Sequence, residues 1–179
     1  YSNNYIADVL IHKLGTETSL PVKGTRSTYQ RGLKKVRHFL VNKVKLDPSF
    51  IWRSGSGLHS SNRFSALQVV QILNYVYQEP LYFPDYLMSL PRSGINGTLE
   101  KRFLSKSPTA LLQGRVRAKT GTLTRPISVS SLAGYFHHPK HGMIAFAMLQ
   151  NGRPGYKQPS ILDFQLSQEM AILKLWKKI

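Results

Sequence analysis

Apolar residues in the first half of the chain recur every three to four positions, which is the spacing of amphipathic helices. This pattern predicts three helices, over residues 2–13, 27–44 and 64–77. Ser2 is the expected N-cap of the first helix, and Pro84 is one of two prolines expected to close the third. The first half of the chain is therefore predicted to be helical.

The period changes in the second half of the chain, where residues 115–120 alternate long basic and small side chains, as strands do. Residues 115–120, 128–136 and 143–150 are the predicted strands, and residues 137–142 are a predicted hairpin turn. Residues 161–176 return to helical spacing and are expected to cover the sheet. Helices followed by a meander and a covering helix predict an α+β fold, with an antiparallel sheet flanked by helices.

The charge of the chain is strongly one-sided. In 179 residues, 25 lysines and arginines face 8 aspartates and glutamates, which leaves a formal net charge of +17. Such an excess favours an anionic partner or anionic surroundings. A nucleic-acid-binding module is one interpretation, but no nucleic-acid-binding motif is present and aromatic residues do not interleave with basic ones. Anionic polymers of a cell envelope are therefore favoured, and no specific nucleic acid is expected.

The residue types exclude several kinds of site. Without cysteine, the chain has no thiolate metal site, disulfide or cysteine nucleophile. The acidic residues are scattered, which disfavours a two-carboxylate glycosidase or a carboxylate metal cage. Histidines cluster only at His137, His138 and His141, where Pro139 prevents the helical spacing of metal ligands and favours a solvated turn. We expect neither a metal nor a cofactor.

The tetrapeptide Lys119-Thr120-Gly121-Thr122 is the best candidate for a binding site. On a strand, Lys119 and Gly121 share one side, so an ammonium stands next to a position without a side chain. A substrate backbone could lie against that gap, with its anionic end drawn to the lysine and to the threonine hydroxyls. Taken alone, the tetrapeptide also fits an ordinary solvated strand end.

The sequence around this tetrapeptide, residues 114–123 and 129–135, closely resembles the third-motif region of penicillin-binding D-alanyl-D-alanine carboxypeptidases. The similarity is to the low-molecular-mass class that also acts as an endopeptidase. Three further blocks follow the order of that family. Residues 2–4 resemble its Ser-x-Asn motif, residues 56–58 its Asp-Gly-Ser-Gly-Leu-Ser segment, and residues 90–99 its Leu-Pro-x-x-Gly-x-Asp-Gly-Thr-Leu segment.

The chain departs from the family pattern at three points. Ser54 and Asn96 stand where the family usually has aspartate, and no serine is followed by a lysine three residues later. The nucleophile motif Ser-x-x-Lys is thus absent. The resemblance implies that residues 1–179 are part of one penicillin-binding, transpeptidase-like domain, with the nucleophile-bearing amino-terminal segment outside them. Residues 60–62 also match Ser-x-Asn, but they fall within the block that begins with the glycine-rich residues 54–57 and not before it, which favours Ser2.

The resemblance implies a serine-type D-alanyl-D-alanine carboxypeptidase/endopeptidase that acts on peptidoglycan stem peptides through an acyl-enzyme. Such an enzyme uses no cofactor, reacts with β-lactam antibiotics and works in the bacterial periplasm or cell envelope. Two alternatives stay open: a relative that binds peptidoglycan without cleaving it, and a basic nucleic-acid-binding module. The first alternative differs only in the nucleophile segment, which lies outside this sequence.

The resemblance also implies a role for each matching residue. Ser2 would relay protons to the leaving amine, and Asn4 would hold the substrate amide. Lys119 would orient Ser2 and, together with Thr120 and Thr122, bind the terminal carboxylate of the substrate. The backbone N–H of Thr122 would also complete the oxyanion hole. We therefore predict that the two motifs converge on one cleft.

Overall fold

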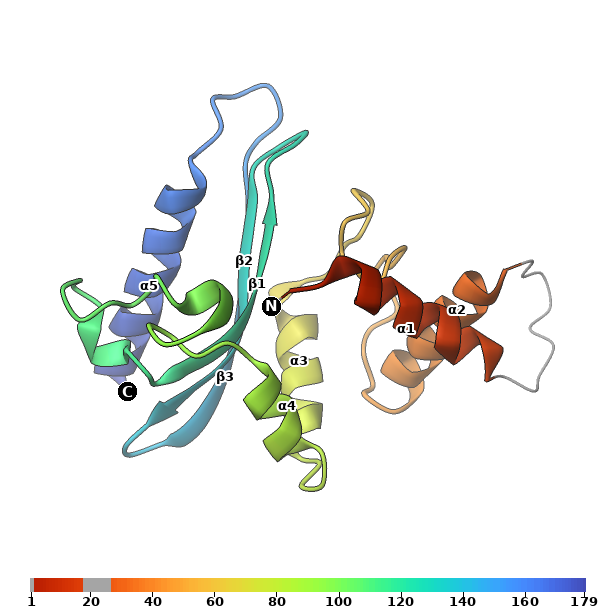
Figure 1. Ribbon diagram of the computed structural model, residues 1–179, viewed down its shortest axis with the longest axis horizontal. Helices are drawn as coiled ribbons and strands as arrows, with labels where there is room; N and C mark the ends of the chain where they lie inside the picture. Colours follow the sequence, from red (N-terminus) through yellow and green to blue (C-terminus); the bar gives the residue numbers. More distant parts are fainter. Residues whose placement is uncertain (1, 18–26) are drawn as a thin grey trace. The chain divides into compact units, whose positions relative to one another are not determined.

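The computed structural model describes residues 2–17 and 27–179, which fold as two compact units, Tyr1–Ile72 and Leu73–Ile179 (Figure 1). Each unit has its own hydrophobic core. In chain order, the helices and strands are α1 (Asn4–Thr16), α2 (Thr28–Asn42), α3 (Ala66–Tyr77), α4 (Phe83–Ser89), the 3-10 helices η1 (Gly97–Leu99) and η2 (Ala110–Leu112), β1 (Val116–Leu123), β2 (Val129–His138), β3 (Gly142–Asn151) and α5 (Ile161–Lys178).

In the first unit, α1 and α2 pack so closely that their backbones touch. A Cβ atom on Gly32 would lie 1.9 Å from the carbonyl oxygen of Ile11, so only glycine fits at this position of α2. The apolar side of α2 packs on the segment that follows it, where Leu40, Leu46 and Phe50 form a buried core. The second predicted helix is therefore present, over fewer residues than expected.

The start of α1 differs from the prediction. Asn3, and not Ser2, is the N-cap, because the Asn3 side-chain oxygen accepts a hydrogen bond from the Ile6 N–H at 3.0 Å. Asn3 has the extended backbone that a cap needs, and asparagine caps helices as well as serine does. Ser2 therefore lies one residue before the cap and is exposed.

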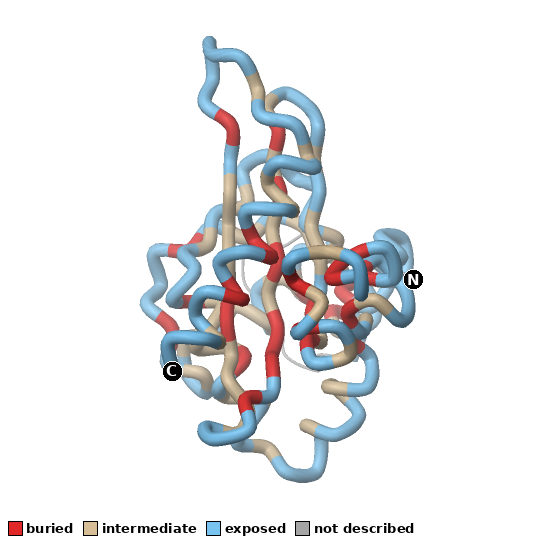
Figure 2. Tube along the Cα trace, turned by 90° about the vertical axis from the view of Figure 1, so that its left-hand side faces the viewer, coloured by how far each residue is buried: buried red, intermediate tan, exposed pale blue. Residues whose placement is uncertain are grey.

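The second unit is built on the antiparallel sheet that the sequence predicts. Its strand order is β1-β2-β3, and both strand pairs are antiparallel. Buried positions alternate with half-buried ones along the first half of β2 (Figure 2). The buried face packs against α5, with Val116, Leu132 and Ile172 among the fully buried residues of the shared core. The helix predicted over residues 161–176 thus covers the sheet.

The opposite face of the sheet contacts α4, a helix that the sequence pattern does not predict. Tyr135 of β2 lies edge-on against Phe83, with ring centroids 5.3 Å apart, and its hydroxyl donates to the Leu73 carbonyl oxygen at 2.7 Å. Burial raises the pKa of the Tyr135 phenol. Pro84 lies in the first turn of α4, where its missing N–H leaves no helical hydrogen bond unmade, so this proline opens a helix.

A buried ion pair joins α5 to the segment between η1 and η2. Arg102 Nε donates to Glu169 Oε1 at 2.8 Å, and the Phe103 N–H donates to the other carboxylate oxygen at 3.2 Å. The neighbouring Gln168 donates from its side-chain amide to the Ser130 carbonyl oxygen of β2 at 3.2 Å. The helix is thus tied to the sheet by polar as well as apolar contacts. Among the described residues, no helix is both long and apolar enough to cross a membrane.

Candidate active site

Lys119 lies in the middle of β1, opposite Ala133 of β2. It is exposed, and its neighbours along the strand are the buried Ala118 and the half-buried Thr120. The Nζ ammonium donates to the Thr120 carbonyl oxygen at 2.6 Å, and desolvation lowers the pKa of the Lys119 side chain. Because an ammonium has three donors, Lys119 can also bind an anion beside the strand.

The edge of β1 that faces away from β2 is only partly paired. The Ala118 N–H donates to the Pro91 carbonyl oxygen at 3.0 Å, and the Ser93 N–H donates to the Val116 carbonyl oxygen at 2.9 Å. Because hydrogen-bonding direction alternates along a strand, the N–H of Thr122 points to the same edge. Within the described residues, no backbone group pairs with it there. This N–H is available to an oxygen atom of a bound molecule.

The segment before β1 also supports Thr120. The Thr120 hydroxyl donates to the Thr98 hydroxyl of η1 at 2.9 Å. A hydroxyl both donates and accepts, so Thr98 can donate to Thr120 when Thr120 turns its own proton toward a ligand. The only sign of Thr98 in the sequence is its place in the block over residues 90–99.

Asn96 and Ser54, the two departures from aspartate, both act as hydrogen-bond acceptors. The Asn96 side-chain oxygen accepts from the Arg92 N–H at 2.7 Å, which closes a turn. Ser54 Oγ accepts from the His59 N–H and from Asn62 Nδ2, both at 3.2 Å. Each position therefore keeps an acceptor oxygen without needing a negative charge.

The Ser-x-Asn motif lies at the amino end of α1. Asn4 is the first residue of the helix, Ser2 precedes the cap, and both residues are exposed. In the part of the chain that the structure describes, neither side chain has a hydrogen-bond partner. Both polar groups are therefore available to a ligand.

Asp8 of α1 fixes the glycine loop, Ser54–Gly57. Its carboxylate accepts from the Tyr29 hydroxyl at 2.6 Å and from the Ser56 N–H at 3.1 Å. The Tyr29 oxygen in turn accepts from the Gly55 N–H at 3.0 Å. The hydrogen bond from Tyr29 is the main cause that holds the pKa of Asp8 below its usual value. A charged Asp8 is thus the acceptor around which the loop is organised.

Gly55 brings the loop into direct contact with α1. A Cβ atom at this position would lie 2.5 Å from Ile11 Cγ1 and 2.9 Å from the Ala7 carbonyl oxygen. Only a residue without a side chain allows this approach. The loop therefore lies against the helix that begins with Asn4.

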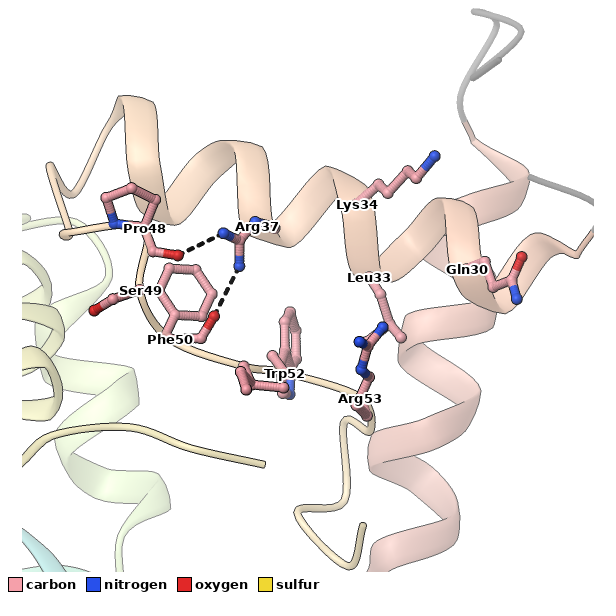
Figure 3. A pocket seen from close by; sticks show the side chains of 10 residues that line it. Gln30, Leu33, Lys34, Arg37, Pro48, Ser49, Phe50, Trp52 and Arg53 are labelled. Atoms are coloured by element: carbon pink, nitrogen blue, oxygen red, sulfur yellow. Dashed lines mark hydrogen bonds between the residues drawn. The ribbon is translucent and has the colours of Figure 1, made fainter. Parts of the chain in front are cut away.

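Arg37 of α2 holds the segment that leads into the glycine loop (Figure 3). Its guanidinium lies 4.4 Å from the centroid of the Phe50 ring and donates to the carbonyl oxygens of Pro48 and Phe50 at 2.6 and 3.0 Å. Trp52 Nε1 donates to the Ser54 carbonyl oxygen at 2.5 Å. A cavity of about 560 Å³ remains between α2 and this segment. The loop is thus anchored before its first glycine as well as within it.

The two candidate motifs belong to different units: Ser2 and Asn4 to the first, Lys119 and Thr122 to the second. Their convergence on one cleft stays a prediction. The sequence analysis assigns no site role to Asp8, although Asp8 follows Asn4 by four residues and so lies on the same face of the helix. Within the described residues, no group of three or more histidine, cysteine or acidic side chains could hold a metal ion.

Comparison with known proteins identifies similar sequences. A model of the D-Ala-D-Ala carboxypeptidase 3 (S13) family matches residues 1–168. The chain is 30% identical over 170 residues to Penicillin-sensitive carboxypeptidase A of Dictyostelium discoideum, which covers 90% of this chain and 30% of that protein. It is 33% identical over 98 residues to Carboxypeptidase DacB of Mycolicibacterium smegmatis, which covers 54% of this chain and 20% of that protein.

Solved structures of penicillin binding protein 4 (dacB) from Haemophilus influenzae have a similar fold. One matches with a TM-score of 0.76 at 23% identity and covers 98% of this chain and 37% of that chain. Another, complexed with a novel beta-lactam, matches with a TM-score of 0.78 at 22% identity. This match covers 98% of this chain and 39% of that chain. The chain thus spans between 20% and 39% of the length of these relatives.

Proposed function

The chain belongs to the D-Ala-D-Ala carboxypeptidase 3 (S13) family, and we propose that it forms part of a serine-type D-alanyl-D-alanine carboxypeptidase/endopeptidase that acts on peptidoglycan stem peptides. The observation that carries this proposal is the open edge of β1, where Lys119 and the N–H of Thr122 lie on one short stretch of strand. A cation beside an unpaired edge N–H suits an extended peptide that ends in a carboxylate.

The nucleophile of the proposed reaction belongs to a segment outside these 179 residues. No serine of the chain is followed by a lysine three residues later, so Ser-x-x-Lys is assigned to another part of the same penicillin-binding domain. Its serine oxygen would lose a proton to the lysine and attack the carbonyl carbon between the two D-alanines. The C–N bond then breaks, the terminal D-alanine leaves with a proton on its amine, and water hydrolyses the ester.

The first unit would contribute the proton relay. The Ser2 hydroxyl passes a proton to the leaving amine, because a hydroxyl accepts and donates at once. Asn4 binds the substrate amide. Asn62, in the alternative Ser-x-Asn match, accepts from the Arg53 N–H at 2.7 Å and donates to Ser54. Its side chain is already committed to the loop, which supports the assignment to Ser2 and Asn4.

The second unit would contribute the carboxylate site and half of the oxyanion hole. Lys119 binds the terminal carboxylate, and the hydroxyls of Thr120 and Thr122 donate beside it. Gly121 leaves room for the substrate backbone. The N–H of Thr122 donates to the developing oxyanion, together with the N–H of the nucleophilic serine. Loss of one such donor typically costs about 3 kcal/mol of transition-state stabilisation.

The surroundings proposed for this enzyme are the bacterial periplasm or cell envelope. A net charge of +17 suits a location among anionic envelope polymers. Reaction with β-lactam antibiotics is proposed because the structure of the Haemophilus influenzae relative is complexed with a novel beta-lactam.

Labelling with a fluorescent penicillin tests the proposal. We expect a longer protein with the Ser-x-x-Lys segment to be labelled covalently. The 179-residue chain alone should stay unlabelled, because the Lys119 ammonium that would bind the carboxylate cannot take a proton from one of the chain's own serines. In the longer protein, Lys119→Ala should weaken labelling by roughly tenfold, since the carboxylate anchor is lost. Lys174→Ala, at an exposed position of α5, is the matched control. Labelling of the isolated chain at Ser2 would contradict this assignment of roles.

A synthetic peptide that ends in D-Ala-D-Ala separates catalysis from binding alone. We expect the longer protein to release D-alanine from it. Binding of the peptide without release of D-alanine would instead identify a non-catalytic peptidoglycan-binding relative.

A further inference from the structure

A cavity of about 520 Å³ lies at the start of β1, within the unit Leu73–Ile179. Arg92, Arg115, Arg117 and His137 line this arginine cavity, and none of its lining residues is acidic. Three guanidinium groups in one cavity without an acidic residue make a strong local excess of positive charge.

Arg117 reaches the cavity because alternate residues of β1 face opposite sides of the sheet. Val116 and Ala118 are buried in the core on one side, so Arg117 projects from the other. Its Nη1 donates to the carbonyl oxygens of Leu87 and Leu90, at 3.4 and 3.3 Å, where α4 ends. The carboxyl end of a helix carries partial negative charge, so this contact fixes the guanidinium without neutralising it.

Arg92 is also fixed by a carbonyl group and not by a carboxylate. Its Nε donates to the Gly114 carbonyl oxygen at 2.7 Å, and Arg92 pairs with Arg117 in an antiparallel bridge. Burial, and then the positive charge of Arg92, lower the pKa of Arg117. Within the described residues, no salt bridge reaches either arginine. Two like charges are thus held near each other, at a cost that a bound anion would offset.

We propose that the arginine cavity binds a ligand that carries at least two phosphoryl groups. A guanidinium group can donate two parallel hydrogen bonds to the oxygens of one phosphate. A carboxylate has two acceptor oxygens, enough for one guanidinium, whereas a phosphoryl group offers three strong acceptors. The cavity lies within the size range of small-molecule sites and has room for more than one such group.

The arginine cavity is separate from the candidate active site. The two have no lining residue in common, and Arg117, the cavity residue nearest to Lys119 along β1, precedes it by two residues, about 7 Å at the usual rise of about 3.3 Å per residue. Phosphate binding here does not depend on the proposed hydrolytic function. Either proposal can therefore fail while the other holds.

Calorimetric titration of the 179-residue chain with inorganic pyrophosphate tests the proposal. We expect saturable binding, and about tenfold weaker binding for Arg115→Gln because a charge-assisted contact is lost. Arg115 suits this test because it is exposed and its side chain has no hydrogen bond within the described residues. Lys101→Gln removes the same charge from an exposed position outside the cavity and is the control.

Two further probes identify the source of the phosphate. Equal affinity for pyrophosphate and for a short polyphosphate indicates a free pyrophosphate compound, and tighter binding of the polyphosphate indicates a polymer; both support the proposal. The proposal is overturned if pyrophosphate binding does not saturate, if R115Q and K101Q lose affinity equally, or if citrate binds more tightly than pyrophosphate. Loss of binding in the longer protein also overturns it, because protein atoms would then fill the cavity.

Discussion

The two regions that carry the family's motifs are held in different ways. Lys119–Thr122 lie on a strand that is paired with β2 along its whole length and backed by a buried core. The glycine loop beside α1 is held by side-chain hydrogen bonds, among them those of the Asp8 carboxylate and the Tyr29 hydroxyl. Backbone pairing survives single side-chain changes, whereas a carboxylate contact depends on one residue and on its ionisation. The strand should therefore tolerate substitution and pH better than the loop.

The largest effect on stability is expected at Glu169 of α5, the helix that covers the sheet, because this residue belongs to a buried ion pair. Glu169→Gln removes the charge that pairs with the buried Arg102, so an unpaired guanidinium remains in the interior. Breaking such a pair typically costs about 3–5 kcal/mol. We expect the free energy of unfolding to fall by about 3 kcal/mol or more, measured by urea denaturation.

The two tryptophans allow each unit to be followed separately, because Trp52 lies in one unit and Trp176 in the other. In a Trp52→Phe background, the fluorescence of Trp176 reports the unit that contains Glu169, and adding Glu169→Gln should shift the urea transition of that unit. In a Trp176→Phe background, the fluorescence of Trp52 reports the other unit, and Glu169→Gln should shift its urea transition less. A loss below about 1 kcal/mol would contradict the importance of this pair, and an equal shift of both transitions would contradict separate unfolding of the two units.

A smaller effect is expected at the loop. Asp8→Asn keeps the shape of the side chain but replaces charge-assisted hydrogen bonds to Tyr29 and Ser56 with neutral ones. We expect the free energy of unfolding to fall by about 1–2 kcal/mol and the amide of Ser56 to exchange faster with solvent. Asp47→Asn, at an exposed position outside this network, is the matched control.

The same contact makes the loop sensitive to acid. The hydrogen bond from Tyr29 holds the pKa of Asp8 in the folded protein below its usual value, so the ionised form stabilises the fold above the pKa of the unfolded chain. This contribution is lost as the pH falls through the folded pKa. The difference in stability between the wild type and Asp8→Asn should therefore be present near neutral pH and shrink as the pH falls below about 4, the ordinary pKa of an aspartate. A difference that does not change with pH would contradict an ionised Asp8.

The sequence predicts the fold well where one periodicity covers a whole element. Residues 115–120 alternate long basic and small side chains, which predicts a strand there, and the covering helix follows from its apolar spacing. Pro84 is misleading because proline both ends helices and opens them, and only the contact of α4 with the sheet decides between the two. Asn3 and Ser2 are equally good caps by residue type, so backbone geometry made the choice.

The candidate site is predicted less completely, because its supports are distant in sequence. Lys119 is found from a local motif on a strand. Asp8 acts on Ser56, which lies 48 residues away, and Thr98 acts on Thr120, which lies 22 residues away. No local periodicity encodes such pairs, so only the folded chain reveals them.

The smallest effect is expected at Thr98, whose hydroxyl is exposed and uncharged. Thr98→Val removes the partner of the Thr120 hydroxyl and keeps the volume of the side chain. A neutral, exposed hydrogen bond contributes at most about 1 kcal/mol, so the free energy of unfolding should change by less than that. In the longer protein, however, penicillin labelling should slow about two- to fivefold, because Thr120 loses the donor that leaves its own proton free for a carboxylate. Thr98→Ser keeps the hydroxyl and should label at the wild-type rate. If the valine and serine variants label equally, Thr98 does not act through its hydroxyl, and the strand holds its motif by backbone pairing alone.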